Sequence, residues 1–177
     1  MRSWLPLPLL VPFFTLFATG AGTGPALLAC GSSKVCSLLA CQSAATVRMT
    51  ATVSAADLAR ATVTACRGDG TTAACASGRI NNVPAAPGDR LPFNLSGSVD
   101  VKGVAGSPDA TGGYLLEFAY NLEGAQPRAG DVYEVKVVVD NAAVAQLQER
   151  ATYETSQPNG ADCPPVCYNV TIDKTKK

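Results

Sequence analysis

The chain has 177 residues and no formal net charge, with 14 basic and 14 acidic side chains. This balance argues against nucleic acid or a charged membrane surface as a partner, because such binding depends on a large electrostatic term. The sequence contains no histidine, the commonest general base and metal ligand, so we expect no catalytic residues, no metal site and no cofactor.

Residues 1–29 have the features of a signal peptide for export. Arg2 supplies a positive charge, and residues 5–17 form an apolar run that only prolines and Thr15 interrupt. This run is too short and too rich in proline to be a committed membrane span. The single tryptophan, Trp4, lies in this segment, so the mature domain would contain no tryptophan.

The end of this segment, Leu27-Leu28-Ala29-Cys30, resembles the lipobox of bacterial lipoproteins. In such proteins the cysteine thiol receives a diacylglycerol, and the cysteine becomes the new amino terminus after cleavage. The resemblance implies lipidation at Cys30, a lipidated tether over residues 30–44 and a place in the cell envelope, at the outer membrane. The alternative is ordinary signal cleavage after Gly20, where Ala18 and Gly20 satisfy the small-residue rule, which would give a secreted protein.

The cysteine count favours the lipoprotein interpretation. The chain has 7 cysteines, an odd number for an exported protein, because thiols pair in an oxidising compartment. If Cys30 carries lipid, an even set remains, and we expect all of its members to form disulfides. The set is Cys36, Cys41, Cys66, Cys75, Cys163 and Cys167.

Residues 45–173 are expected to form one domain, followed by a disordered tail at 174–177. Apolar and polar residues alternate with the period of two that a half-buried strand requires, over residues 45–53, 60–65, 98–102, 114–120, 133–139 and 166–172. The segment 144–150 could be a helix, but it also suits the return strand of a hairpin that turns at Asp140-Asn141, and we favour the strand. The pattern predicts an all-β fold: a single antiparallel β-sandwich, immunoglobulin-like or fibronectin-III-like, stapled by disulfides.

One disulfide pairing follows from hairpin geometry. Cys66 and Cys75 flank a hairpin and lie directly opposite each other if the loop is the four residues 69–72, whereas a two-residue turn would offset them. The remaining four cysteines would then form two staples between the amino and carboxyl ends, for example Cys41 with Cys163. By loop entropy the hairpin bridge contributes about 2.7 kcal/mol and a long staple about 4.9 kcal/mol, so losing a long staple should cost more.

The carboxyl-terminal segment 153–167 contains the turn Pro158-Asn159-Gly160 and ends in Cys163-Pro164-Pro165-Val166-Cys167. It resembles a segment that recurs in small predicted lipoproteins of myxobacteria, which share a lipobox cysteine and an early cysteine pair. The resemblance covers the two ends of the chain. It implies an envelope location and a disulfide-bonded β domain, and it implies no activity.

Two motifs could carry chemistry but have simpler structural explanations. Cys163 and Cys167 could be half of a metal or redox site, but pairs in such sites are usually spaced C-x-x-C. Arg67-Gly68-Asp69 matches a tripeptide that some adhesion receptors recognise, yet Gly-Asp-Gly is typical of a hairpin turn. We therefore favour structural disulfides and a structural turn.

Two further sets of residues are most simply explained as surface residues. Asn94 and Asn169 match glycosylation sequons, which matter only in a eukaryotic secretory pathway. Paired carboxylates could hydrolyse glycosides, but the strand carboxylates fall at outward or edge positions, and nothing in the sequence brings two of them together. These carboxylates are Glu117, Glu134, Glu149 and Glu154.

Together these features predict a membrane-anchored, non-enzymatic β-sandwich of the cell envelope that acts as a structural or protein-binding module. Its expected partners are the membrane, through the lipid anchor, and another envelope protein. The alternative is a secreted enzyme inhibitor or a small enzyme of unknown reaction. The loop 80–93, with Pro84, Pro87 and Pro92, would suit an inhibitor as a stiff, exposed binding loop.

Overall fold

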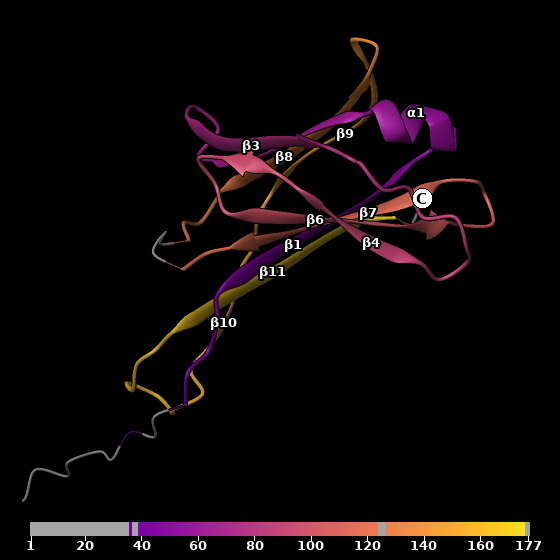
Figure 1. Cartoon of the computed structure of the whole chain (residues 1–177). Coiled ribbons are helices and arrows are strands. Elements are labelled where there is room, and N and C mark those ends of the chain that lie inside the picture. The colour runs from indigo at the N-terminus through magenta and orange to yellow at the C-terminus, as the bar shows by residue number, and fades with distance from the viewer. Residues whose placement is uncertain (1–35, 37–38, 124–126, 176–177) are drawn as a thin grey trace, which may run out of the picture. The chain divides into compact units, whose positions relative to one another are not determined.

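The computed structural model of the protein describes residue 36 and residues 39–123 and 127–175 (Figure 1). Cys30 and the expected signal peptide, 1–29, lie outside the described residues. Within the part of the chain that is described, no helix is long and apolar enough to cross a membrane.

The described residues form two sheets, with strand orders β10-β11-β1-β7-β6-β4 and β5-β3-β2-β8-β9. The six-stranded sheet contains β1 (Ala44–Ala51), β4 (Arg90–Asn94), β6 (Val101–Pro108), β7 (Tyr114–Asn121), β10 (Glu154–Ser156) and β11 (Cys167–Lys174). The five-stranded sheet contains β2 (Thr62–Gly68), β3 (Ala73–Arg79), β5 (Ser96–Gly97), β8 (Val132–Val139) and β9 (Ala142–Arg150). The helix α1 (Ala55–Arg60) leads from β1 in the first sheet to β2 in the second.

The two sheets share one hydrophobic core, which the alternation of side chains along the strands produces. The inward residues of β7 and β8 are Tyr114, Leu116, Phe118, Tyr120, Tyr133, Val135, Val137 and Val139. Tyr120 of one sheet meets Tyr133 of the other edge to face, with ring centroids 4.8 Å apart. The strands predicted at 114–120 and 133–139 are therefore confirmed, as are their buried faces.

The prediction of an all-β domain is confirmed as two sheets in which most neighbouring strands are antiparallel. A fully antiparallel arrangement is wrong for β1 and β11, which pair in parallel from Ala44 opposite Asn169 to Met49 opposite Lys174. The two strands run in the same direction because the segments that lead into them are cross-linked at the same end of the domain. The first and last long strands of the domain thus lie side by side.

The helix α1 was not predicted. Ser54 is its N-cap, and the Ser54 hydroxyl accepts a hydrogen bond from the backbone N–H of Asp57 at 3.1 Å. Leu58 is fully buried, which fixes the helix against the core. A helix of only 6 residues is too short for a 3.6-residue period to stand out in the sequence.

The segment 144–150 belongs to β9, in agreement with the predicted return strand. Asp140 and Asn141 form the preceding turn with positive φ angles of 47° and 69°, the conformation of a tight hairpin. In the predicted loop 80–93, residues 85–88 are exposed. Ile80, Pro84 and Phe93 are buried in the domain, and the end of the segment forms β4 at the edge of a sheet.

The predicted apolar face of the last strand is only partly correct. Ile172 is buried, Tyr168 and Val170 are half-buried, and Val166 precedes the strand and is exposed. The reason is visible in Figure 1, where β10 and the beginning of β11 extend away from the other strands. The first residues of β11 therefore lie beyond the main core.

Candidate functional site

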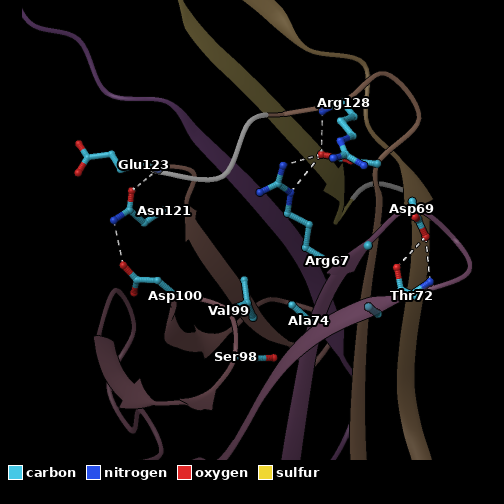
Figure 2. Close-up of a pocket in the computed structure, with 13 residues that line it drawn as sticks. Arg67, Asp69, Thr72, Ala74, Ser98, Val99, Asp100, Asn121, Glu123 and Arg128 are labelled. Atoms are coloured by element: carbon cyan, nitrogen blue, oxygen red, sulfur yellow. Dashed lines mark hydrogen bonds and ion pairs between the residues drawn. The ribbon is translucent and has the colours of Figure 1, made fainter.

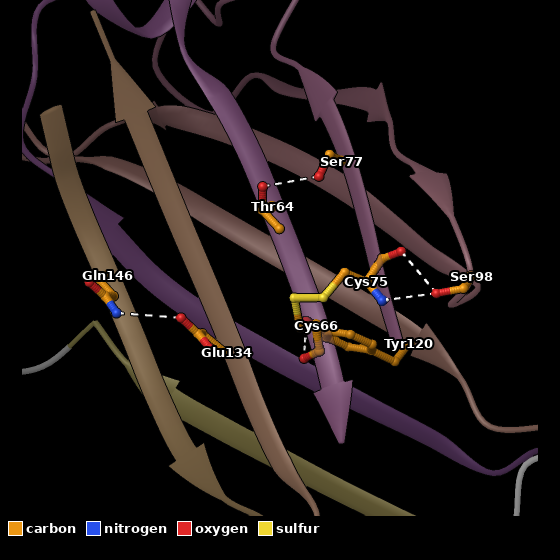
Figure 3. Close-up of a disulfide and its surroundings, with 8 residues drawn as sticks. All are labelled: Thr64, Cys66, Cys75, Ser77, Ser98, Tyr120, Glu134 and Gln146. Carbon is orange, nitrogen blue, oxygen red and sulfur yellow. Dashed lines mark hydrogen bonds between the residues drawn. A yellow bond between two sulfur atoms is a disulfide. The ribbon is translucent and has the colours of Figure 1, made fainter. Parts of the chain in front are cut away.

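The β2–β3 hairpin carries one disulfide (Figure 3). Cys66 lies directly opposite Cys75 in the register, with Cα atoms 4.0 Å apart, and the two sulfur atoms are bonded. The loop between the strands is the four-residue segment 69–72 on which this pairing depends, and the backbone N–H of Asp69 closes it by donating to the Thr72 carbonyl at 3.2 Å. Hydrogen bonds from Thr72 and Thr71 hold the pKa of Asp69 well below its usual value.

The other four cysteines join the two ends of the domain. Cys36 is bonded to Cys163 and Cys41 to Cys167, so the six cysteines form three disulfides, as their even number predicts. The example pairing of Cys41 with Cys163 is wrong, because Cys163 takes the earlier cysteine. Since Cys163 and Cys167 each bond to a different partner, they do not form a joint metal or redox pair.

We call residues 36, 39–43 and 157–167 the disulfide pole. The Asn159 side chain organises it, because its Oδ1 accepts from the Leu39 backbone N–H at 3.0 Å and its Nδ2 donates to the Leu39 carbonyl at 3.1 Å. Nδ2 also donates to the Pro164 carbonyl at 2.6 Å. Two disulfides and one amide thus fix the backbone of the pole, while the side chains of Leu39 and Val166 are 58% and 39% exposed.

A buried polar network centres on Asp131, directly before β8. Asp131 is only 5% exposed and is the one buried charged residue in the described part of the chain. Its Oδ2 accepts hydrogen bonds from Arg67 Nη2 at 2.7 Å, from Tyr153 Oη at 2.8 Å and from the Arg128 backbone N–H at 3.2 Å. The Tyr153 hydroxyl also lies 2.7 Å from that of Tyr133.

The network fixes the ionisation of its members. Burial alone would raise the pKa of Asp131, but the hydrogen bonds from Arg67, Tyr153 and Arg128 outweigh it, so the pKa lies below its ordinary value. Burial, and then the hydrogen bonds with Tyr133 and Asp131, raise the pKa of Tyr153. At neutral pH the centre is therefore a carboxylate paired with a guanidinium and bonded to a neutral phenol.

A pocket of about 1200 Å³ opens beside this network (Figure 2). Its walls are the β2–β3 hairpin, the turn 98–100, and residues 121, 123, 128 and 131. The polar groups of the walls largely bond to one another: Asn121 Nδ2 donates to Asp100 Oδ2 at 2.9 Å, and the Glu123 backbone N–H donates to Asn121 Oδ1 at 3.0 Å. These bonds hold the loops around the pocket in place.

The tripeptide Arg67-Gly68-Asp69 falls in this region, but its two charged side chains point to internal partners. Arg67 lies on the inward phase of β2 with Val63 and Ala65, and its guanidinium pairs with Asp131. Asp69 binds the backbone of its own loop. The structure therefore gives these residues structural roles in the hairpin.

Asp131 and Tyr153 were not singled out from the sequence. One signal could have indicated the network: the period of two puts Arg67 on the buried face of β2, where a guanidinium needs an anionic partner. The sequence does not reveal which carboxylate provides it. Asp131 is 64 residues away along the chain.

The carboxylates considered for catalysis are separated rather than paired. Glu117 binds Arg48 and Arg90 on the six-stranded sheet, at 2.7 and 2.9 Å. Glu149 binds Lys174 at 2.8 Å, and Glu134 lies in β8 with Gln146 at 3.5 Å. Glu154 is exposed in β10, and the sequon residues Asn94 and Asn169 are exposed in β4 and β11.

Among the residues that the structure describes, no group of three or more His, Cys, Asp or Glu side chains is placed to hold a metal ion. Comparisons of the chain with protein-family models, curated proteins and solved structures find no significant match. The function must therefore be argued from the chemistry of the chain itself.

Proposed function

We propose that the protein is a lipid-anchored protein of the bacterial cell envelope, whose domain is a non-enzymatic structural or protein-binding module. The anchor would be Cys30, the cysteine of Leu27-Leu28-Ala29-Cys30. Three disulfides support an oxidising compartment, since such bonds form and persist outside the cytosol. The outer membrane is the expected site, and we also propose kinship with the small myxobacterial lipoproteins that the carboxyl-terminal segment resembles.

The observation that carries this proposal is the double cross-link at the disulfide pole. Cys36 and Cys41 lie six and eleven positions after the proposed anchor, and they are bonded to Cys163 and Cys167, which lead into β11. A pull on the anchor is thus transmitted to both ends of the domain at once. Without these bonds the same force would act on the amino-terminal segment alone and would peel β1 from the sheet.

The pocket beside Asp131 supports a structural interpretation of the domain. Arg67 and Asp131 neutralise each other, and Asp100 binds Asn121, so these groups maintain the loops instead of converging on open space. The two sheets with their common core also support an immunoglobulin-like or fibronectin-III-like sandwich, the fold that we propose. Such a domain binds partners through its loops and sheet faces.

The proposal is tested by changing Cys30→Ala in cells that carry the lipoprotein pathway. The wild-type protein should incorporate labelled fatty acid and sediment with membranes, and the variant should do neither. A Cys36→Ala variant is the matched control, since it removes a cysteine six positions away and should keep the label. Fatty-acid labelling that survives in Cys30→Ala would refute the anchor.

A further inference from the structure

We propose that the disulfide pole is a membrane-contacting surface, and that Leu39 and Val166 insert into the interfacial region of the bilayer that holds the lipid anchor. This inference rests on the proposed lipidation of Cys30. It adds a second contact with the same membrane and fixes the orientation of the domain.

The length of the tether brings the pole to the membrane. Cys36 is six positions after Cys30, and a fully extended chain of that length spans at most about 22 Å. Cys36 is bonded to Cys163, with Cα atoms 5.6 Å apart, so Cys163 is restrained to within about 28 Å of the lipidated residue. No other part of the domain is held so close to the lipid.

The composition of the pole suits a lipid interface. Of the three large hydrophobic side chains that are exposed in the described residues, Leu39 and Val166 lie here. Ala161, Pro164 and Pro165 are also exposed, and in the described residues of the pole the only charged side chain is that of Asp162. Burial of apolar surface would thus drive insertion, with little cost from dehydrating charges.

The pole is also rigid, which favours insertion. Two disulfides and hydrogen bonds from Asn159 to Leu39 and Pro164 hold the described backbone of the pole. In this arrangement the Leu39 and Val166 side chains are 58% and 39% exposed. Their apolar surface is therefore already exposed in the free protein, so little conformational entropy is lost when the pole contacts the membrane.

The opposite end of the domain would then face away from the membrane. β1 runs from the pole for 8 residues to Ala51, and a strand of this length spans about 26 Å. Arg60 of α1 binds Asp140 of the β8–β9 turn at 2.7 Å, so these two elements lie together beyond that end of the strand. Val144, the third exposed hydrophobic residue, follows this turn and would lie far from the bilayer.

A single tryptophan can report the contact, because the only tryptophan of the chain, Trp4, is removed with the signal. We would prepare full-length lipidated Leu39→Trp, Val166→Trp and Val144→Trp variants in phosphatidylethanolamine–phosphatidylglycerol vesicles, with and without brominated acyl chains. Val144 is the matched control, since it is 36% exposed against 39% for Val166. Mapping of the disulfides would verify the fold of each variant.

We expect brominated lipid to quench the fluorescence of Leu39→Trp and Val166→Trp several-fold more than that of Val144→Trp. Adding Leu39→Asp to Val166→Trp should reduce this quenching. Equal quenching at the three positions, in protein that floats with the vesicles and carries lipid on Cys30, would overturn the inference and leave the anchor intact. Protein without lipid on Cys30 would refute the anchor and the inference together.

Discussion

Arg67 and Asp131 form an ion pair inside the domain, with Arg67 Nη2 2.7 Å from Asp131 Oδ2 and Arg67 Nε donating to the same oxygen at 3.1 Å. Only 11% and 6% of the two side chains are exposed. The pair joins β2 to the residue before β8, and Tyr153 connects it to the segment between β9 and β10. Removing one member would leave the other charge buried without this counter-charge.

Changing Arg67→Met should therefore lower the free energy of unfolding by about 3–5 kcal/mol, the usual cost of breaking a buried pair. The control is Arg60→Met, because Arg60 also forms ion pairs but is 54% exposed. It should lose little stability, because solvent screens an exposed ion pair. Urea titration measures both, and similar small losses in the two variants would contradict a stabilising role for the network.

The stability should also depend on pH through Asp131. Its pKa is lowered in the folded protein relative to about 3.9 in the unfolded chain, so the folded state binds the proton less readily. The resulting stability is fully present above the unfolded pKa and is lost as the pH falls through the lower folded pKa. The wild type should exceed Asp131→Asn in unfolding free energy at pH 7, and the difference should shrink below about pH 4. A difference that stays constant with pH would show that the carboxylate charge is unimportant.

Two disulfides join the same two segments of the disulfide pole. Losing only one of them should therefore cost less stability than expected for a single long staple. While Cys41–Cys167 is intact, Cys36–Cys163 closes only a small ring through residues 36–41 and 163–167. Losing it by Cys36→Ala with Cys163→Ala should thus cost about 2.8 kcal/mol, close to the 2.7 kcal/mol or so of the hairpin bridge.

Replacing all four cysteines of the pole by alanine removes the large loop as well, and should cost about 8 kcal/mol. A loss of this size is comparable to the whole stability of many domains, so this variant should be mostly unfolded at 25 °C. Thermal unfolding compares the stability of three variants: Cys36→Ala with Cys163→Ala, Cys66→Ala with Cys75→Ala, and the variant that lacks all four cysteines of the pole. If Cys36→Ala with Cys163→Ala were as unstable as the four-cysteine variant, the remaining Cys41–Cys167 bond would not stabilise the domain on its own.

The β8–β9 turn provides a local test. Asn141 has a φ of 69°, which asparagine and glycine tolerate and alanine does not. Asn141→Ala should destabilise the domain by roughly 1–2 kcal/mol, whereas Asn141→Gly should be nearly neutral. Asn82→Ala, in an exposed loop position without a positive φ, is the control and should have little effect. Equal stability of the two Asn141 variants would argue against this turn conformation.

Much of the fold could be predicted because its central strands are half-buried. In β7 and β8 every second residue is apolar and buried, and Glu117, Glu134 and Lys136 mark the opposite face of the strands. β9 could be predicted from the turn that precedes it. Asp140 and Asn141 are residue types that tolerate the positive φ angles of a tight hairpin turn. Local chemistry determines these elements, and local chemistry is visible in the sequence.

The elements that were missed depend on distant contacts. β4 contains Pro92 and is an edge strand, so its pairing with β6 is not evident from its own residues. β10 has three residues, and it pairs only with β11. Two staples between the amino and carboxyl ends were predicted, but the parallel pairing of β1 with β11 was not, because no local pattern specifies the direction in which two strands so far apart in the chain pair.

The polar network was missed for the same physical reason. The inward position of Arg67 indicates that a partner exists, but Asp131 and Tyr153 look like ordinary loop residues until the chain folds. The hairpin disulfide is the contrasting case. Cys66 and Cys75 are 9 positions apart, so the loop between them specifies their register directly.

The most direct test of the account is the mass of the amino-terminal peptide of the mature protein, isolated from membranes under non-reducing conditions. We predict that this peptide begins with Cys30 and carries the mass of a diacylglycerol, and that no free thiol remains among the other six cysteines. A mature chain that begins with an unmodified Ala21, and in which Cys30 bears no lipid, would contradict the anchor and with it the membrane orientation of the domain.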